Sequence, residues 1–469
     1  MNHNKNVVVF TLVTTFILFF YSALTAKYQF NILGLNNISI LSDIVISTHD
    51  TVPNNSVTAG ENLPTVSMAA APETKGPPPV FGDKANGKYV IPKTIIRFSG
   101  DTSQPSLPLL MQKLIALKQG KKQKIRIGWF GDSMIEGDLL SQTFRKKIQQ
   151  FFGGRYGVGF IAANSVVANF RSTATHKWKG DWKDENFKTK ELSSPLFLSG
   201  HTYFTSNGEI DLKDLSFKDT NQSLQKSLIC GSVAGGQISL TVNGQQKQFY
   251  AGKMINRILL DSSYSHEIEV KLNDSRVPVY GISMEPEEGV VVDNFSFRGI
   301  TGLELGKLDS AFLNSMETEN NYDLVILEYG ANLMFRPDDV DYSWYQKHII
   351  PVVKKLQKAM PHTEFLIIST ADRAFMYDNT WKSAKGIENL VKIQAELACA
   401  NEAAFYNMYT SMGGEGTIVK WADTVPALAN KDYIHPNFKG AEILGTMLYD
   451  AFIKDFYKAC MFGGKGVSN

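Results

Sequence analysis

The stretch KIRIGWFGDSMIEGD, residues 124–138, runs from an apolar segment through a Gly-Asp-Ser turn into a helical pattern. Apolar residues dominate 124–130, which predicts a buried strand, and the amphipathic period of 139–152 predicts a helix. Asp or Ser at such a junction can cap the following helix. A turn of this kind can also present the hydroxyl of a nucleophilic serine. These residues alone leave both interpretations open.

Helices and strands alternate on both sides of a long interruption. A helix is predicted over 109–118, before the first strand. The second part of the chain predicts strands at 322–330, 363–370 and 403–409, and helices at 344–358, 387–400 and 438–454. Such alternation is typical of a parallel sheet whose two faces are covered by helices. We therefore expect a three-layer α/β/α domain.

The interruption has a different pattern. Short alternating segments at 236–244, 246–252, 266–273 and 277–286 are separated by Gly, Asn, Asp and Ser turns, with little helical period. This pattern predicts a β-sandwich or jelly roll. The simplest arrangement is a discontinuous α/β domain, residues 105–163 and 294–469, with a sandwich inserted at 164–293.

The first hundred residues predict a tethered protein. Residues 7–26 carry no charge and are mostly apolar, about the length that spans a bilayer as a helix. We expect residues 1–30 to be a signal anchor in the inner membrane, or a signal peptide that is cleaved to give a secreted protein. Residues 31–104 are rich in Thr, Pro, Asn and Ser and predict a flexible linker. Both alternatives place the remaining domains outside the cytoplasm, in the periplasm or cell envelope if the segment is an anchor, or secreted if it is cleaved.

Composition excludes some classes of partner. The net charge is +2 and no extended basic run is present, so we expect no nucleic-acid partner. The 3 cysteines are odd in number and far apart, which indicates neither a disulfide framework nor a metal site. We expect them to pack as small apolar side chains. The sequence does not decide the oligomeric state.

Residues suited to nucleophilic catalysis recur at predicted strand ends. A serine hydroxyl needs a base to take its proton, and the base needs a group that orients it. Asp432 and His435 lie three apart in DYIHPNFKG, just before the last helix. Asn332 follows another strand, and the turn RGITG contains Gly302. Because ligands bind at the carboxyl ends of strands in open parallel sheets, we expect these groups to lie near Ser133.

The order Gly-Asp-Ser, glycine turn, Gly-x-Asn and Asp-x-x-His resembles the four sequence blocks of the SGNH, or GDSL-type, hydrolases. The resemblance implies a flavodoxin-like sheet and a serine nucleophile, Ser133, with His435 as its base and Asp432 as the orienter. It also implies an oxyanion hole formed by the Ser133 N–H, Gly302 and Asn332, with Gly299 as an alternative to Gly302. A serine mechanism of this kind needs no metal ion and no cofactor.

Three further segments, 155–160, 279–302 and 408–421, resemble bacterial peptidoglycan O-acetylesterases that carry an inserted, carbohydrate-binding-like jelly roll. The resemblance implies removal of O-acetyl groups from cell-wall glycan, at muramoyl O-6 of peptidoglycan, through an acetyl-serine intermediate. Three alternatives stay open: an O-acetyltransferase, an acetylesterase for another polysaccharide, and a non-catalytic glycan-binding protein. Trp178 and Trp182 either stack on a sugar or fill the sandwich core.

Overall fold

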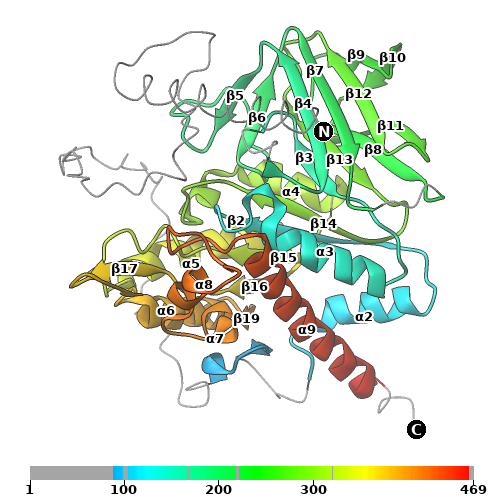
Figure 1. Ribbon diagram of the computed structural model, residues 1–469. Helices are drawn as coiled ribbons and strands as arrows, with labels where there is room; N and C mark the ends of the chain where they lie inside the picture. The colour runs from blue at the N-terminus through cyan, green and yellow to red at the C-terminus, as the bar shows by residue number, and fades with distance from the viewer. Residues whose placement is uncertain (1–87, 99–103, 166–169, 218–220, 320, 464–469) are drawn as a thin grey trace, which may run out of the picture. The chain divides into compact units, whose positions relative to one another are not determined.

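A six-stranded sheet forms the centre of the α/β part in the computed structural model (Figure 1). The structure describes residues 88–98, 104–165, 170–217, 221–319 and 321–463. The strand order is β1-β19-β16-β15-β2-β14, and all neighbours are parallel except β1 and β19. The strands are β1 (Ile95–Arg97), β2 (Lys124–Gly131), β14 (Gly289–Ser296), β15 (Leu324–Glu328), β16 (Glu364–Ile368) and β19 (Ala404–Tyr406).

Both faces of this sheet are buried. Along β15, Leu324 and Ile326 pack into one apolar cluster, whereas Val325 and Leu327 pack into another. Successive side chains of a strand point to opposite faces, so a strand that is buried on both faces is apolar at every position. This confirms that the sheet is the middle layer of the predicted three-layer domain.

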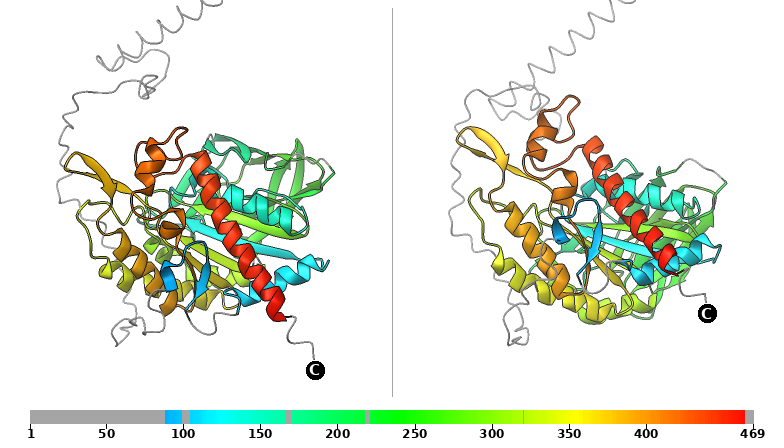
Figure 2. Two further views of the ribbon diagram at one scale, coloured as in Figure 1. Left: turned by 60° about the horizontal axis from the view of Figure 1, so that its bottom comes forward. Right: turned by 90° about the horizontal axis from the view of Figure 1, so that it is seen from below.

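Helices form the two outer layers. Three helices, α2, α3 and α9, share the apolar cluster on one face, and α9 runs across that face beside α3 (Figure 2). Helices α4, α5 and α6 share the cluster on the opposite face. Their bounds are α2 (Pro108–Lys118), α3 (Leu139–Phe151), α4 (Ser310–Glu319), α5 (Ser343–Ala359), α6 (Ile387–Ala400) and α9 (Phe438–Gly463). The shorter helices are η1 (Lys88–Val90), η2 (Glu136–Asp138), η4 (Leu303–Lys307), α7 (Met408–Met412) and α8 (Thr417–Asp423).

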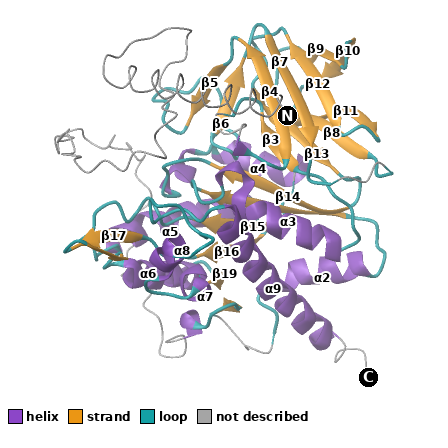
Figure 3. Ribbon diagram, viewed as in Figure 1, coloured by secondary structure: helices purple, strands orange, loops and turns teal. Residues whose placement is uncertain are grey.

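The insertion is a β-sandwich, as expected (Figure 3). One sheet has the order β10-β9-β12-β7-β4 and the other β11-β8-β13-β6-β5, with β3 also pairing β13. All pairs are antiparallel. The strands are β3 (Gly159–Ala162), β4 (Ala174–Gly180), β5 (Lys183–Asn186), β6 (His201–Phe204), β7 (Gly208–Asp214), β8 (Leu224–Cys230), β9 (Gln237–Val242), β10 (Gln245–Tyr250), β11 (Asn256–Ser263), β12 (Glu267–Leu272) and β13 (Val279–Glu285).

The junctions of the insertion differ from the expected division at 164 and 293. Strand β3 already belongs to the sandwich, and β14 belongs to the central sheet, paired with β2 from Gly289 to Ser296. The inserted strands therefore run from Gly159 to Glu285. An apolar run such as VVV at 290–292 has the same appearance in a sandwich core and in a buried parallel strand, so the pattern could not distinguish them.

The end of the predicted linker is ordered. Within the expected 31–104 segment, β1 adds an antiparallel strand beside β19, and the Lys93 N–H donates to Ser411 Oγ at 2.8 Å. The short apolar run at 95–96 was too brief to predict a strand within a polar segment. The predicted anchor, residues 1–30, lies outside the described residues. Among the helices that the structure describes, none combines the length and apolar character needed to cross a membrane.

The cysteines are all free thiols. Cys230 is buried, as expected, but Cys460 is exposed at the end of α9.

Candidate active site

Ser133 lies in the turn between β2 and η2, and α3 begins only at Leu139. The Oδ1 atom of Asp132 accepts the Met134 N–H at 2.9 Å and lies too early in the chain to cap α3. The residue before α3 is Asp138, whose side chain makes no capping hydrogen bond. The capping interpretation of the Gly-Asp-Ser turn is therefore wrong for both residues.

The hydroxyl of Ser133 meets an imidazole. Ser133 Oγ lies 2.8 Å from His435 Nε2, and His435 Nδ1 lies 2.7 Å from Asp432 Oδ2. Because the neighbour of Nδ1 is a carboxylate, that nitrogen carries the proton and Nε2 accepts from the serine hydroxyl. The structure thus brings together the three residues predicted to act as nucleophile, base and orienter.

Asp432 is held in its ionised form. Burial alone would raise its pKa, but hydrogen bonds from the His435 side chain and from the backbone N–H groups of His435 and Ile434 lower the pKa below its usual value. The carboxylate is therefore charged at neutral pH and stabilises an imidazolium on His435.

The loop that carries Asp432 and His435 is tied at both ends. The Asn430 N–H donates to the His435 carbonyl at 2.9 Å. Asn437 caps α9, accepting the N–H groups of Lys439 and Gly440 at 3.0 and 3.2 Å. These contacts fix the loop at both ends. They hold His435, which lies two residues before Asn437, facing the serine turn.

Asn332 uses both N–H groups of its side chain within the protein. One donates to Asp132 Oδ2 at 3.0 Å and the other to the Ile300 carbonyl at 2.9 Å. The second bond places Asn332 beside the turn that contains Gly299 and Gly302. For Asn332 to donate to an oxyanion, as the resemblance implies, one of these two bonds must open or be shared.

The two candidate glycines have different surroundings. Gly302 is buried with φ 90°, and a Cβ there would lie 2.7 Å from a ring carbon of Tyr329. Gly299 has φ 79° and is exposed, and a Cβ there would meet nothing within 4 Å. Both positions favour glycine for its backbone angle, and Gly302 also for close packing. The choice of oxyanion donor between them stays a prediction.

Two carboxyl groups lie behind the serine turn, and the sequence did not indicate a chemical role for either of them. Burial raises the pKa of Asp132 to about 6, against the opposing effects of the Met134 N–H, His435 and Asn332. Burial and then the nearby Asp132 raise the pKa of Glu328 to about 8, although its Oε2 accepts the Trp129 indole N–H at 2.9 Å. Glu328 is therefore mostly protonated at neutral pH.

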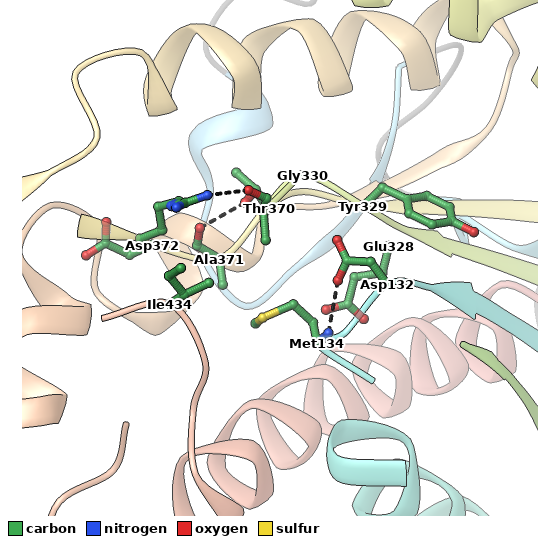
Figure 4. A pocket seen from close by; sticks show the side chains of 11 residues that line it. Asp132, Met134, Glu328, Tyr329, Gly330, Thr370, Ala371, Asp372 and Ile434 are labelled. Atoms are coloured by element: carbon green, nitrogen blue, oxygen red, sulfur yellow. Dashed lines mark hydrogen bonds between the residues drawn. The ribbon is translucent and has the colours of Figure 1, made fainter. Parts of the chain in front are cut away.

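A pocket adjoins these groups (Figure 4). Its lining includes Met134 and Ile434, the chain neighbours of Ser133 and His435, whereas Ser133 and His435 themselves do not line it. Figure 4 shows Asp132, Glu328 and Met134 on one side of it. The segment that follows β16, residues 370–373, forms the other side. This segment was not among the predicted site residues, although its place at the carboxyl end of a parallel strand could have indicated it.

No family model and no curated protein matches the chain. Among solved structures, a peptidoglycan O-acetylesterase matches with a TM-score of 0.62 at 20% identity, covering 77% of this chain and 99% of that one. This chain has the fold of that esterase. The fold predicted from the resemblance to SGNH hydrolases, with its inserted sandwich, is thereby confirmed.

Other matches are much weaker. A family two carbohydrate esterase from Cellvibrio japonicus has a TM-score of 0.26 at 11% identity, covering 59% of this chain and 99% of its own. A GDSL-like lipase from Bacteroides thetaiotaomicron has a TM-score of 0.25 at 18% identity, covering 36% and 76%. Their similarity to this chain is too low to support an argument.

Proposed function

We propose that the protein is a serine esterase that removes O-acetyl groups from a cell-wall glycan, specifically from muramoyl O-6 of peptidoglycan. The observation that carries the esterase chemistry is the chain of two hydrogen bonds, 2.8 Å and 2.7 Å long, from Ser133 through His435 to Asp432. The glycan is proposed from the sequence resemblance and from the fold shared with a peptidoglycan O-acetylesterase.

The first half-reaction forms an acetyl-serine. Ser133 Oγ attacks the acetyl carbonyl carbon while His435 Nε2 takes the hydroxyl proton. Asp432 stabilises the imidazolium, and the N–H groups of the oxyanion hole stabilise the negative oxygen. The carbon–oxygen bond to the sugar then breaks, and His435 returns the proton to the departing sugar oxygen.

The second half-reaction regenerates the serine. His435 takes a proton from water, and the resulting hydroxide attacks the acetyl carbon. The bond to Ser133 Oγ breaks, Ser133 recovers its proton from His435, and acetic acid leaves. Each step uses the same three side chains.

We also propose a place for this reaction. An inner-membrane anchor at residues 1–30, followed by a linker, would hold the esterase in the periplasm, within reach of the cell wall. The inserted sandwich would bind glycan or form one wall of the active site. Trp182 is half-buried against the sandwich core and its indole donates to the Lys179 carbonyl, which favours a packing role for this tryptophan.

The test is acetate release from O-acetylated peptidoglycan by the purified full-length protein, with acetylated xylan as the comparison polymer. We expect release from peptidoglycan, and its loss by at least about 1,000-fold in Ser133→Ala and in His435→Ala, because each removes one member of a unit. Circular dichroism and thermal melting check that both variants remain folded. Undiminished release by folded Ser133→Ala would refute the mechanism, and release from xylan alone would refute the proposed glycan.

A further inference from the structure

Arg373 places a positive charge in the pocket that Met134 and Ile434 also line. Its Nη1 donates to the Ala331 carbonyl at 2.6 Å, and its guanidinium lies 4.4 Å from the ring centre of Phe375. Its Nε is buried without a hydrogen-bond partner, and it makes no ion pair with any carboxylate of the described residues. A largely buried cation that makes no ion pair is costly, so its presence in a pocket points to a ligand.

Among the residues that line the pocket, Arg373 alone is positively charged. Burial lowers the pKa of Arg373, opposed by Tyr342, Asp432 and Tyr377, yet a guanidinium stays protonated at neutral pH. Of the carboxylates, Asp432 is the one whose charge acts on Arg373, and Asp432 is already engaged by His435.

The acidic groups of the pocket are each turned toward a protein donor. Asp132 accepts from Met134, Glu328 from Trp129, and Asp372 Oδ2 from the Ile418 N–H at 2.9 Å, whereas Asp372 Oδ1 is buried without a hydrogen-bond partner. The three carboxyl groups therefore leave the Arg373 donors free of protein acceptors other than the Ala331 carbonyl.

We propose that Arg373 binds a carboxylate of the substrate and makes the enzyme selective for acetyl esters of acidic compounds. A guanidinium binds a carboxylate with two parallel hydrogen bonds, and here Nε and Nη2 donate to no acceptor in the described part of the protein, so a carboxylate that moves the covering side chains aside could accept from both. The ester would then lie with its acetyl group toward Ser133 and its acidic group toward Arg373. The inference rests on the proposed esterase chemistry and narrows its substrate class to acetylated acidic sugars.

The test compares matched acid and amide substrates on the full-length protein. The acids are acetoxyalkanoates of increasing chain length, so that one places its carboxylate within reach of Arg373, and each is paired with its primary amide. We expect the wild type to prefer the best acid over its amide in kcat/KM. In Arg373→Gln, kcat/KM for that acid should fall about 10- to 100-fold, while kcat/KM for the amide changes less than about twofold.

Two further variants separate charge from position. Arg373→Lys keeps the charge but loses the planar pair of donors, and should retain part of the preference. Arg336→Gln removes an exposed arginine near Asn332 that stacks on Phe335 and does not line the pocket. This variant should retain the full preference for the acid over its amide. Equal losses on acid and amide in Arg373→Gln would overturn the proposal, because Arg373 would then only position the Ala331 segment.

A binding measurement tests the role of Arg373 separately from the proposed esterase function. If no acetyl ester is cleaved, the esterase proposal fails, and calorimetric titration of Ser133→Ala with the same acids and amides decides the role of Arg373. Tighter binding of the acid that is lost in the Ser133→Ala, Arg373→Gln double variant supports the assignment. Equal affinity of acid and amide overturns it.

Discussion

Two buried carboxyl groups lie behind the nucleophile, and they differ in charge. Glu328 is the last residue of β15 and pairs with Gly131, and its pKa near 8 keeps it mostly neutral at pH 7. Asp132, with a pKa near 6, is mostly ionised there and is attracted to His435. A neutral Glu328 lets Asp132 carry the single charge, since two adjacent buried carboxylates would repel each other.

Glu328→Gln should change the pH dependence of stability. The folded pKa of Glu328 is raised, so its contribution to stability is full below the unfolded value and is lost as pH rises through about 8. Glutamine keeps an acceptor for Trp129 and cannot ionise. Between pH 5 and pH 8 the variant should therefore gain on the order of 3 kcal/mol in unfolding free energy relative to wild type. Urea unfolding at both pH values measures this.

The matched control for that measurement is Glu287→Gln, an exposed glutamate whose replacement should leave the pH dependence of the wild type unchanged. Parallel stability curves for Glu328→Gln and wild type would show that Glu328 ionises normally in the folded protein.

Local motifs explain which site residues could be predicted. Ser133, Asp432 and His435 stand in short patterns whose spacing alone suggests their chemistry, and the structure brings them together. Glu328 ends an apolar strand and Arg373 follows another, with no motif around either. Their positions depend on which strands are neighbours, and a sequence pattern does not give that order.

At the scale of elements, a small hairpin supports the catalytic loop. Strands β17 (Ala374–Tyr377) and β18 (Thr380–Ser383) are joined through Asp378 and Asn379, which both have positive φ, as a tight two-residue hairpin turn requires. Trp381 of β18 stacks on Tyr433, with ring centres 4.2 Å apart. Tyr433 lies next to Asp432 and has φ 55°, so this stack holds a strained residue within the catalytic loop.

Trp381→Ala should therefore slow catalysis with little effect on substrate binding. Without the stack, Asp432 and His435 are less well oriented toward Ser133, and we expect kcat to fall roughly 10- to 100-fold while KM changes little. Trp381→Phe, which can still stack, should restore most of kcat. Lys382→Ala, on the exposed neighbouring residue, is the control. A rise in KM at unchanged kcat would instead assign Trp381 to substrate binding.

The hairpin also marks a limit of sequence reasoning about elements. Both ends of α6 were predicted correctly, because many residues share one periodicity, whereas α9 continues to Gly463, beyond its predicted end at residue 454. Each strand of the hairpin has four residues and an irregular burial pattern, which gives no reliable period. Its role comes from a contact with a residue more than 50 positions away, Tyr433.

In the described part of the molecule as a whole, the inserted sandwich shares its core with the α/β domain. Phe197 and Tyr280 stack with ring centres 4.9 Å apart, and they belong to the same apolar cluster as Phe312 of α4. The carboxylate of Glu285, at the end of β13, binds Arg126 of β2 through two hydrogen bonds of 2.6 and 2.8 Å. The two domains should therefore unfold together.

Glu285→Gln tests this coupling. Glu285 also lies 3.2 Å from Arg257 and 3.0 Å from Lys124, so replacing it removes a buried negative charge that three cationic side chains share. We expect a loss of about 3–5 kcal/mol in unfolding free energy. In calorimetry this should lower the temperature of a single transition, because the shared core prevents either domain from melting alone. Glu288→Gln, whose partly exposed pair with Arg155 spans 3.8 Å, should cost less than about 1 kcal/mol. Two separate transitions, of which only one shifts in Glu285→Gln, would show that the sandwich folds independently of the sheet that carries Ser133.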